Sequence, residues 1–562
     1  MTREGGAVAG QALTGTPGLD DILAGGFARN RIYLIEGSPG TGKTTAALSF
    51  LRAGAEAGEK TLYVSLSETE EELRDTVASH GWALEGIEVF ELVPPESLLD
   101  EKQQQSLLYS SDLELGETTR MIFEAVERVR PSRVVIDSLS EIRLLAQSSL
   151  RYRRQVLALK HYFARLQVTV LLLDDLTTDS LDKTVHSVAH GVVRLEELAP
   201  EYGAERRRVR VVKYRGRKFR GGFHDFTIKT GGLEVYPRLV SAEHRTRFDR
   251  SPLACGVQGL DDLLGGGVDR GSSCLILGPS GTGKSLMAIQ FAASAIARGE
   301  RAALFVFDEE EGLLLDRTRA MGIDLEALRE EGHLLIQQVD AAELSPGEFT
   351  AKVRECVGSQ NIQTVVIDSL NGYQASMPEE HFLLLHIHEL LQYLNRQGAT
   401  TFLTVAQHGL VGDMKAPVDI TYLADTVLLL RYFEAFGEVR RAVSVIKKRS
   451  GRHEKTIREY EIEPQGLKVG PPLTDFHGVL RGVPNFVVRG RVSWAIGLHD
   501  DELDPGLGAR ADPGADGPGR ADRGRHPGRG EDRDDHLPRP RRARAGARCR
   551  GRGGPDRRGG AA

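Results

Sequence analysis

The sequence of 562 residues predicts an α/β protein with two tandem domains, each a mainly parallel sheet flanked by helices, and a disordered tail. Three observations lead to this fold class. The two halves repeat one another, short apolar runs alternate with helix-like segments, and the composition changes abruptly near residue 490. We place the two domains at 1–240 and 241–485, and the tail at 486–562.

The internal repeat consists of three matched segments in the same order in each half. "GSPGTGKT" at 37–44 matches "GPSGTGKS" at 278–285, which places Lys43 and Lys284 241 positions apart. "RVVIDSLS" at 133–140 matches "TVVIDSLN" at 364–371, and a Lys-x-Arg pattern follows later in both halves. Three matches in one order indicate a duplicated domain.

Short apolar runs within each half predict the strands. In the first half they lie at 32–37, 61–66, 133–138 and 168–174. They are rich in Val, Ile and Leu and are bounded by turn residues, as is typical of buried parallel strands. The segments 69–82 and 151–167 carry apolar residues at helical spacing. The alternation predicts βαβ units, and therefore a parallel sheet covered by helices on both faces.

Composition narrows the class of protein. Apolar residues make up 40% and charged residues 27% of the chain, the balance of a globular protein, and the net charge of −6 gives no sign of a polyanion-binding surface. The cysteines form no CxxC pair, so we expect reduced thiols at Cys255, Cys274, Cys356 and Cys549. We find no secretory signal and no apolar run long enough to span a bilayer, and expect a cytoplasmic protein without a membrane partner.

The tail has a composition that opposes folding. Residues 501–562 contain 15 Arg but no Phe, Tyr, Trp or Lys. Such a segment buries too little apolar surface to offset the entropy of ordering, so we predict disorder. Its role stays open between a solvated tail without a defined role and an arginine-rich contact for acidic partners or nucleic acid.

Two glycine-rich loops predict nucleotide sites. Their glycines let backbone N–H groups converge on phosphate oxygens, and the helix that follows adds a favourable dipole. The loop lysine reaches the β- and γ-phosphates, and the Thr or Ser after it binds Mg²⁺. We therefore predict ATP and Mg²⁺ as cofactors of both halves. The predicted loop contacts are Gly37, Gly40, Thr41, Gly42, Lys43 and Thr44, and Gly278, Ser280, Gly281, Thr282, Gly283, Lys284 and Ser285.

Acidic residues at strand ends are the predicted metal and catalytic groups. Asp137 and Asp368 each end an apolar strand, where a carboxylate can contact Mg²⁺ together with Thr44 and Ser285. Glu68, Asp308 and Glu309 are the first acids after the second strand of their halves. They are candidates to orient or deprotonate the nucleophile, and Asp308 is also a candidate metal ligand. The alternative is a solvated acidic first turn of the next helix.

A Lys-x-Arg pattern at the end of a late strand recurs in both halves. The residues are Lys213, Arg215, Lys447 and Arg449. They can form a basic finger that stabilises charge on the γ-phosphate of a neighbouring subunit, or they can form an exposed basic hairpin. The finger would require a ring or filament, because the site is completed only in trans.

Together these segments resemble the family of the circadian-clock ATPase and autokinase KaiC, over about residues 12–485. The resemblance includes "GLDD" before each glycine-rich loop, "ADTVLLLRYFE" at 424–434, "IKKRSGRHEKTIREY" at 446–460 and "GVLRGVP" at 478–484. It implies two RecA-like domains in an ATP-dependent homohexamer of two stacked rings, with nucleotides at subunit interfaces. It further implies slow ATP hydrolysis in the first ring, Ser/Thr autophosphorylation in the second, and regulatory protein partners.

The resemblance also implies which residues are catalytic, which accept phosphate and which contact the nucleotide. At several of these positions the sequence departs from the family pattern. Its Glu-Glu pair reads Ser67-Glu68 in the first half, which places hydrolysis there in question, and Asp308-Glu309 in the second. Its two phosphoacceptors fall on Thr421 and Tyr422, and a further threonine on Ala416, so only Thr421 is kept as a candidate. A structural threonine is the alternative there. The further nucleotide contacts implied are Thr45, Ser79, Lys213, Tyr214, Arg215, Leu286, Arg441, Lys447, Lys448 and Arg449.

Two other functions compete with a KaiC-like ATPase and autokinase. One is a RecA- or RadA-like DNA-dependent ATPase, which needs basic loops facing a central channel. The corresponding segments, 174–191 and 406–421, are neutral to acidic, so we expect no nucleic-acid partner. The other is a nucleotide-gated hexameric scaffold with little turnover, which Ser67 favours for the first half.

Overall fold

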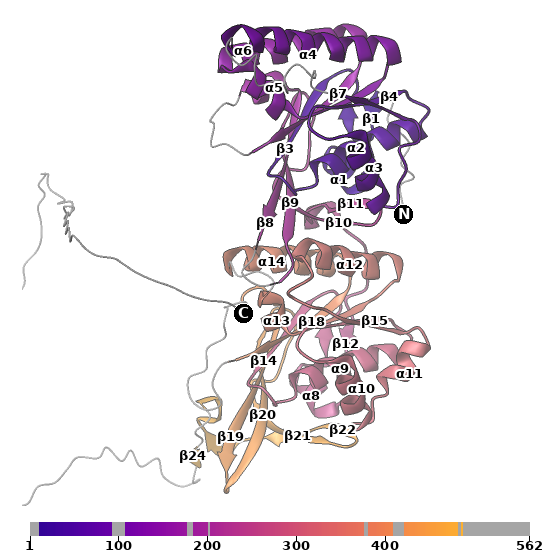
Figure 1. Cartoon of the computed structure of the whole chain (residues 1–562). Helices are drawn as coiled ribbons and strands as arrows, with labels where there is room; N and C mark the ends of the chain where they lie inside the picture. The colour runs from indigo at the N-terminus through magenta and orange to yellow at the C-terminus, as the bar shows by residue number, and fades with distance from the viewer. Residues whose placement is uncertain are drawn as a thin grey trace, which may run out of the picture. The chain divides into compact units, whose positions relative to one another are not determined.

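The computed structural model describes residues 10–92, 107–176, 184–199, 203–375, 380–407, 421–481 and 485–486. It confirms the predicted fold class (Figure 1). Each half contains one nine-stranded, mostly parallel sheet, flanked by helices. The predicted tail, 486–562, lies outside the described residues apart from Phe486.

The elements of the first half begin and end as follows. The sheet strands are β3 (Ile32–Gly37), β4 (Thr61–Ser65), β5 (Ile87–Glu91), β6 (Arg133–Asp137), β7 (Thr169–Asp175), β8 (Gly191–Leu198), β9 (Arg206–Tyr214), β10 (His224–Lys229) and β11 (Gly232–Tyr236). β1 (Gln11–Ala12) and β2 (Phe27–Ala28) form a small separate pair. The helices are α1 (Pro17–Ile22), α2 (Lys43–Glu56), α3 (Glu70–Ser79), α4 (Leu107–Val129), α5 (Leu139–Ala146), α6 (Ser149–Leu166) and α7 (Thr184–Val188), and the short η3 (Ser241–Glu243) begins the second half.

The second half repeats this plan. Its sheet strands are β14 (Ser273–Gly278), β15 (Ala302–Val306), β16 (Leu334–Gln338), β17 (Thr364–Asp368), β18 (Thr400–Ala406), β19 (Thr426–Ala435), β20 (Glu438–Lys448), β21 (Ile457–Glu463) and β22 (Gly466–Pro472). The small pairs are β12 (Pro252–Leu253) with β13 (Val268–Asp269), and β23 (Phe476–His477) with β24 (Asn485–Phe486). The helices are α8 (Gln258–Leu263), α9 (Lys284–Ile296), α10 (Glu311–Arg319), α11 (Leu325–Glu330), α12 (Pro346–Ser359), α13 (Leu370–Ala375), α14 (Glu380–Gln397) and η4 (Val479–Arg481).

The strand orders of the two sheets correspond to one another. The first sheet has the order β11-β10-β9-β8-β3-β7-β6-β4-β5, and the second is β22-β21-β20-β19-β14-β18-β17-β15-β16. From β8 to β5 neighbouring strands are parallel, and β9, β10 and β11 extend the sheet by antiparallel pairing. Since β3 and β14 lie inside their sheets, the glycine-rich loops that follow them emerge between neighbouring strand ends.

Alternate side chains of each strand pack against different helices. In β3, Tyr33 and Ile35 join a core cluster with α1, α2 and α3, whereas Leu34 joins a cluster with α4, α5 and α6. The second sheet divides in the same way. Two buried faces explain why these strands read as continuous apolar runs, because neither face meets water.

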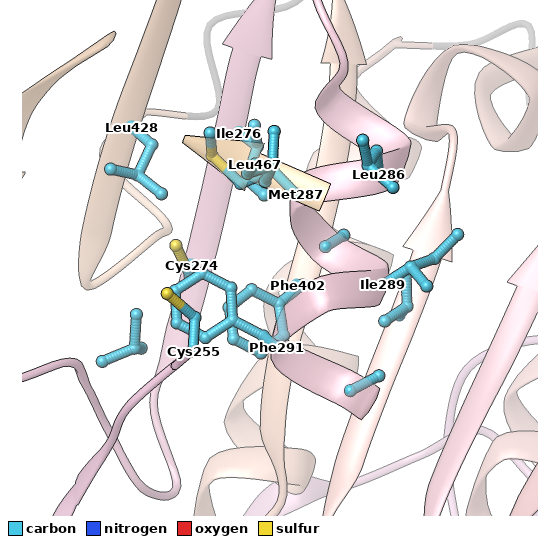
Figure 2. Close-up of a cluster of buried hydrophobic side chains, with 14 of the residues drawn as sticks. Cys255, Cys274, Ile276, Leu286, Met287, Ile289, Phe291, Phe402, Leu428 and Leu467 are labelled. Carbon is cyan, nitrogen blue, oxygen red and sulfur yellow. The ribbon is translucent and has the colours of Figure 1, made fainter. Parts of the chain in front are cut away.

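Helix α9, which begins at the second glycine-rich loop, is anchored by its apolar side (Figure 2). Figure 2 shows Met287 and Phe291 directed toward the sheet, near Cys274 of β14 and Phe402 of β18. The Phe291 and Phe402 rings stack with centroids 4.5 Å apart. This packing fixes the helix, and with it the position of Lys284 in its first turn.

Two further predictions can be compared with the described residues. Cys255, Cys274 and Cys356 are buried free thiols, as expected, whereas Cys549 lies outside the described part. Within the described ranges, no helix combines the length and apolar character needed to cross a bilayer.

Candidate functional site: two phosphate loops and the acids around them

The two glycine-rich loops have nearly the same backbone conformation. Gly40 and Gly42 have φ angles of 82° and 89°, and the corresponding Gly281 and Gly283 have 77° and 91°. These left-handed conformations favour glycine because it lacks a Cβ. Gly42 and Gly283 are the N-caps of α2 and α9, so each loop ends on free N–H groups at the start of a long helix.

The first glycine of each loop lies too close to its surroundings for any side chain. A Cβ on Gly37 would approach Oγ1 of Thr41 to 2.6 Å and the carbonyl oxygen of Leu195 to 2.7 Å. A Cβ on Gly278 would meet the carbonyl oxygen of Leu430 at 2.8 Å. Thr41 closes its loop by donating to the Ser38 carbonyl oxygen at 2.8 Å. The loops are tight main-chain cradles of the kind that bind phosphate.

The two loop lysines have different partners. Lys43 Nζ donates to the carbonyl oxygen of Ser38 at 2.9 Å and lies 2.7 Å from Oδ1 of Asp175. Lys284 Nζ donates to the carbonyl oxygen of Pro279 at 2.8 Å. Burial lowers the pKa of Lys284, and the charge of Asp368 opposes this effect. Both ammonium groups therefore lie folded over their loops, where phosphate oxygens would replace the carbonyl contacts.

Carboxylates converge next to the first loop. Asp137, at the end of β6, accepts hydrogen bonds from Tyr63 at 2.5 Å and Thr44 at 3.3 Å. Burial raises the pKa of Asp137, and the charge of Asp175 adds to this effect. Burial also raises the pKa of Glu68, as does the charge of Asp137, and Oε2 of Glu68 has no hydrogen-bond partner among the described residues. Glu68 is therefore directed at the same acidic cluster as Asp137.

The second half arranges its acids differently. Asp308 accepts a short hydrogen bond from Ser369, the residue after Asp368, and so lies beside the end of β17. Glu309 is held by Arg317 of α10 in a two-pronged contact of 3.0 and 2.7 Å. Of the two acids, Asp308 is the one that lies next to the strand-end aspartate.

A magnesium ion would fit these donors. In the first half the Thr44 hydroxyl and the Asp137 carboxylate already lie within 3.3 Å of each other, and both are oxygen ligands of the type that Mg²⁺ prefers. Among the described residues no group of three or more His, Cys, Asp and Glu side chains forms a metal cage. Mg²⁺ is usually bound by one or two protein oxygens together with substrate phosphates, which is the arrangement that this site offers.

The Lys-x-Arg residues lie at the other edge of the sheet from their own phosphate loop. Lys213 pairs with Val192, which pairs with Leu34, three residues before Gly37. The same register recurs in the second half, where Lys447 pairs with Val427 and through it with Leu275, three residues before Gly278. The phosphate loops follow the carboxyl ends of the parallel strands, whereas the Lys-x-Arg residues lie near their amino ends.

The basic groups at this edge contact main-chain carbonyls of their own half. Lys213 Nζ donates to the carbonyl oxygen of Ala189 at 2.8 Å, and Arg215 to that of Ser187 at 2.6 Å. Lys447 donates to the carbonyl oxygen of Thr421 at 2.8 Å, and Arg449 to that of Tyr422 at 2.5 Å. Arg215 and Arg449 are solvent-exposed in the chain, and are therefore accessible to another molecule.

Three further predicted contacts in the first half lie in different surroundings. Thr45 follows Thr44 in α2, and its hydroxyl is 3.1 Å from Nε2 of His80. Ser79, the last residue of α3, is exposed beside His80. The Tyr214 side chain is buried, and its hydroxyl donates to the carbonyl oxygen of Gly26 at 3.0 Å, so its ring is not available to a nucleotide.

The corresponding residues of the second half can also be located. Leu286 is buried in α9, behind Ser285. Arg441 of β20 has its guanidinium 5.8 Å from the ring centroid of Tyr432. Lys448 donates to the carbonyl oxygens of Leu264 and Gly267 at 2.7 and 2.9 Å.

The candidate phosphoacceptor lies at the border of a segment that the structure does not describe. Thr421 is half-buried and its carbonyl oxygen accepts from Lys447. Ala416 lies outside the described residues, as do 177–183 and 408–420, which make up much of the two segments considered for DNA binding. Phosphorylation at Thr421 stays a prediction.

Sequence reasoning did not single out several residues of the first site. Asp175 at the end of β7 holds Lys43, and Tyr63 of β4 holds Asp137. Glu36, just before the loop, is buried and paired with His186 and Arg194 at 2.6 Å each. Burial alone would raise the pKa of Glu36, but these two partners outweigh it and lower the pKa. A comparison of the two halves could have drawn attention to Glu36 and Asp175, since the second half has no acid at the equivalent positions.

Comparison with known proteins agrees with this geometry. The family described as "ATPase: KaiC" matches the chain twice, over residues 12–240 and 253–474. The chain belongs to this KaiC family. Each of the two matched ranges contains one phosphate loop. The match confirms the resemblance inferred from the sequence.

Individual KaiC proteins align with most of the chain. It is 28% identical over 501 residues to the circadian clock protein KaiC3 of a Synechocystis strain, covering 87% of this chain and 97% of that protein. It is 27% identical over 508 residues to the circadian clock oscillator protein KaiC of Acaryochloris marina, covering 87% and 96%. The KaiC of Prochlorococcus marinus strain MIT 9313 is 29% identical over 483 residues, covering 84% and 95%. Membership of this ATPase family supports ATP binding.

Proposed function

We propose that the chain is a KaiC-like ATPase that binds ATP with Mg²⁺ at both phosphate loops and works as a homohexameric ring. The first half binds nucleotide mainly to hold the assembly together. The second half hydrolyses ATP and transfers phosphate to Thr421. A ring of this kind would signal a nucleotide state to regulatory protein partners in the cytoplasm.

The observation that carries this proposal is the pair of matching phosphate cradles. Each has the same left-handed glycines, a lysine at the first position of a long helix, and an aspartate at the end of the strand that lies second from the loop strand in the sheet. A loop that served only as a structural turn would need neither a lysine over the cradle nor a strand-end acid beside it. The family match supports the same conclusion independently.

The experiment that tests the proposal follows labelled phosphate and particle mass together. The full chain is incubated with γ-labelled ATP and Mg²⁺, and then examined by native mass spectrometry and phosphosite mapping. We expect ATP-dependent hexamers, released phosphate, and label on Thr421. Lys284→Ala should abolish the label while hexamers persist, whereas Lys43→Ala should mainly weaken assembly, because each lysine neutralises phosphate charge in its own half.

The opposite results have clear meanings. Unchanged assembly in Lys43→Ala would show that the proposed division between the halves is wrong. A wild-type chain that stays monomeric and binds no ATP would overturn the proposal as a whole.

A scaffold function is a second candidate for the first half alone. Ser67 stands where the second half has Asp308, and Lys43 is already paired with a carboxylate. Both observations favour nucleotide binding with little turnover. Phosphate release from a Lys284→Ala chain measures the first site separately, and a rate near zero with intact nucleotide binding supports this candidate.

A further inference from the structure

The loop lysines of the two halves differ in one respect. Lys43 lies 2.7 Å from a carboxylate oxygen of Asp175, and this contact is shielded, since only 8% of the lysine side chain is exposed. Lys284 forms no ion pair with a carboxylate among the residues that the structure describes, and its Nζ donates to the carbonyl oxygen of Pro279 instead. Within the described residues, the first loop lysine is therefore in direct ion-pair contact with a carboxylate, whereas the second feels the charge of Asp368 without such a contact.

The difference traces to a single position in the repeat. Asp175 and Ala406 both end the strand beside the loop strand, since Gly37 pairs with Asp175 and Gly278 with Ala406. The backbone N–H of Ala406 donates to the side chain of Asn371 at 2.8 Å, and that of Asp175 donates to the hydroxyl of Ser140, the residue equivalent to Asn371, at 3.4 Å. Asp175 and Ala406 are therefore structurally equivalent positions.

Two other acids near the first loop have cations of their own, whereas Asp137 is held by hydroxyl groups. Asp174 pairs with Arg143 at 2.5 Å, and Glu36 pairs with His186 and Arg194. Asp175 differs, because Lys43 is its only cationic partner in the described residues. Its charge is therefore balanced by the same ammonium group that would balance a bound phosphate.

A nucleoside triphosphate and a nucleoside diphosphate differ in the number of phosphate groups that contact this lysine. A loop lysine contacts both the β- and γ-phosphates of a triphosphate, and its ammonium group has three hydrogens to donate. A γ-phosphate must therefore displace Asp175 from Nζ or lie against it, and like charges at such distances repel strongly in a partly buried site. A diphosphate needs only the β-phosphate contact and leaves Asp175 its place on the lysine.

From this geometry we infer that Asp175 makes the first site select nucleoside diphosphate over triphosphate, relative to the second site. The inference rests on the proposed function, in that both loops bind nucleotide. It concerns how the first site is regulated: the carboxylate of Asp175 on β7 competes with the γ-phosphate for the ammonium group of Lys43. Asp175 is thus a specificity-determining residue. The second half, which has Ala406 at the equivalent position, serves as the comparison without the acid.

Single-site chains allow the selectivity to be measured. In a Lys284→Ala background the dissociation constants of MgADP and of a non-hydrolysable Mg-triphosphate analogue are determined by displacement of a fluorescent nucleotide. We expect Asp175→Asn and Asp175→Ala to lower the triphosphate-to-diphosphate ratio of dissociation constants about tenfold, mainly through tighter triphosphate binding. Asp175→Asn preserves the side-chain shape, so an equal effect in both variants identifies charge as the cause.

Two further variants complete the design. Ala406→Asp in a Lys43→Ala background should raise the same ratio about tenfold at the second site, because it transplants the acid. Glu56→Gln removes an exposed carboxylate at the end of α2, where it pairs with Arg52, and should leave the ratio unchanged. Circular dichroism and size-exclusion profiles establish that each variant is folded.

The possible failures can be told apart. If both nucleotides bind but the ratio in Asp175→Asn stays within about twofold of the parent, or rises, the inference is wrong while the proposed function stands. A rise would show that Asp175 assists triphosphate binding. If no parent chain binds either nucleotide, the proposed function fails as well.

Discussion

The two nucleotide sites use acids from different positions of the same short segment. In the first half Ser67 is exposed, and the neighbouring Glu68 carries the carboxylate that reaches the acidic cluster around Asp137. In the second half Asp308 approaches the strand end, whereas Glu309 is neutralised by Arg317. We therefore expect Glu68 and Asp308 to orient the attacking nucleophile in their respective sites.

This assignment predicts unequal effects of three conservative variants. Asp308→Asn in the otherwise unchanged chain should lower phosphate release about 100-fold, because a positioned base typically contributes that much, and Glu68→Gln in a Lys284→Ala chain should lower the slower release of the first half by the same factor. Glu309→Gln is the matched control and should change the rate less than about threefold, since its partner lies on the helix. Steady-state phosphate release measures all three, and a larger loss for Glu309→Gln than for Asp308→Asn would contradict the assignment.

Strand β6 is joined to the turn after α2 by a buried ion pair, and the second half has no arginine at the equivalent strand position. Arg133, only 2% exposed, donates to both carboxylate oxygens of Glu59 at 3.0 and 2.9 Å and to the carbonyl oxygens of Leu13 and Phe50. Thr364 occupies the equivalent position in β17. Removing Glu59 would leave a buried guanidinium without its counter-ion, which is a costly state.

We expect Glu59→Gln to destabilise the first half by about 3 kcal/mol, the cost typical of breaking a buried pair. Urea unfolding followed by Trp82 fluorescence, in a Trp494→Phe chain, reports this half alone. Glu300→Gln is the matched control, because Glu300 pairs with Arg270 in the second half at 2.5 Å and should leave the Trp82 transition unchanged. Equal shifts of this transition in both variants would contradict the prediction.

The same pair predicts a dependence on pH. Burial alone would raise the pKa of Glu59, but Arg29 and Arg133 outweigh it and lower the pKa from 4.5 to about 2. A carboxylate with a lowered pKa stabilises the fold fully above pH 4.5, and loses this contribution as the pH falls toward about 2. The stability difference between the parent and Glu59→Gln should therefore shrink across this interval.

The sequence predicted elements well where local chemistry determines them. The apolar runs at 32–37 and 133–138 became β3 and β6, and the glycine spacing located both phosphate loops. The late strand predicted to end at the Lys-x-Arg pattern became β9, whereas its antiparallel pairing and the strands β10 and β11 were not predicted, because these strands are half-exposed and lack the continuous apolar pattern. The pairing of Lys43 with Asp175 could not be read from the chain, since these residues are 132 positions apart and meet only because β3 and β7 pair in the sheet.

The duplicated fold places the basic and phosphate-binding groups of each half at opposite edges of one sheet. Arg215 lies beyond the amino end of β8, while the phosphate loop follows the carboxyl end of β3. The arginine therefore cannot reach the phosphate loop of its own half. In a head-to-tail ring, however, the arginine of one copy can meet the phosphate loop of the next copy. The predicted basic finger would therefore act on the site of a neighbouring copy and not on the site of its own chain.

Mixing two inactive chains tests this idea directly. One chain carries Glu68→Gln and Asp308→Asn, and the other carries Arg215→Ala and Arg449→Ala. If the arginines act in trans, an equal mixture should recover about a quarter of wild-type phosphate release, because random assembly gives a quarter of the interfaces an intact acid and an intact arginine. The substituted arginines are exposed, so their loss should cost the fold little. Native mass spectrometry verifies that mixed rings form, and mixed rings without recovered activity would show that the arginines do not complete a neighbour's site.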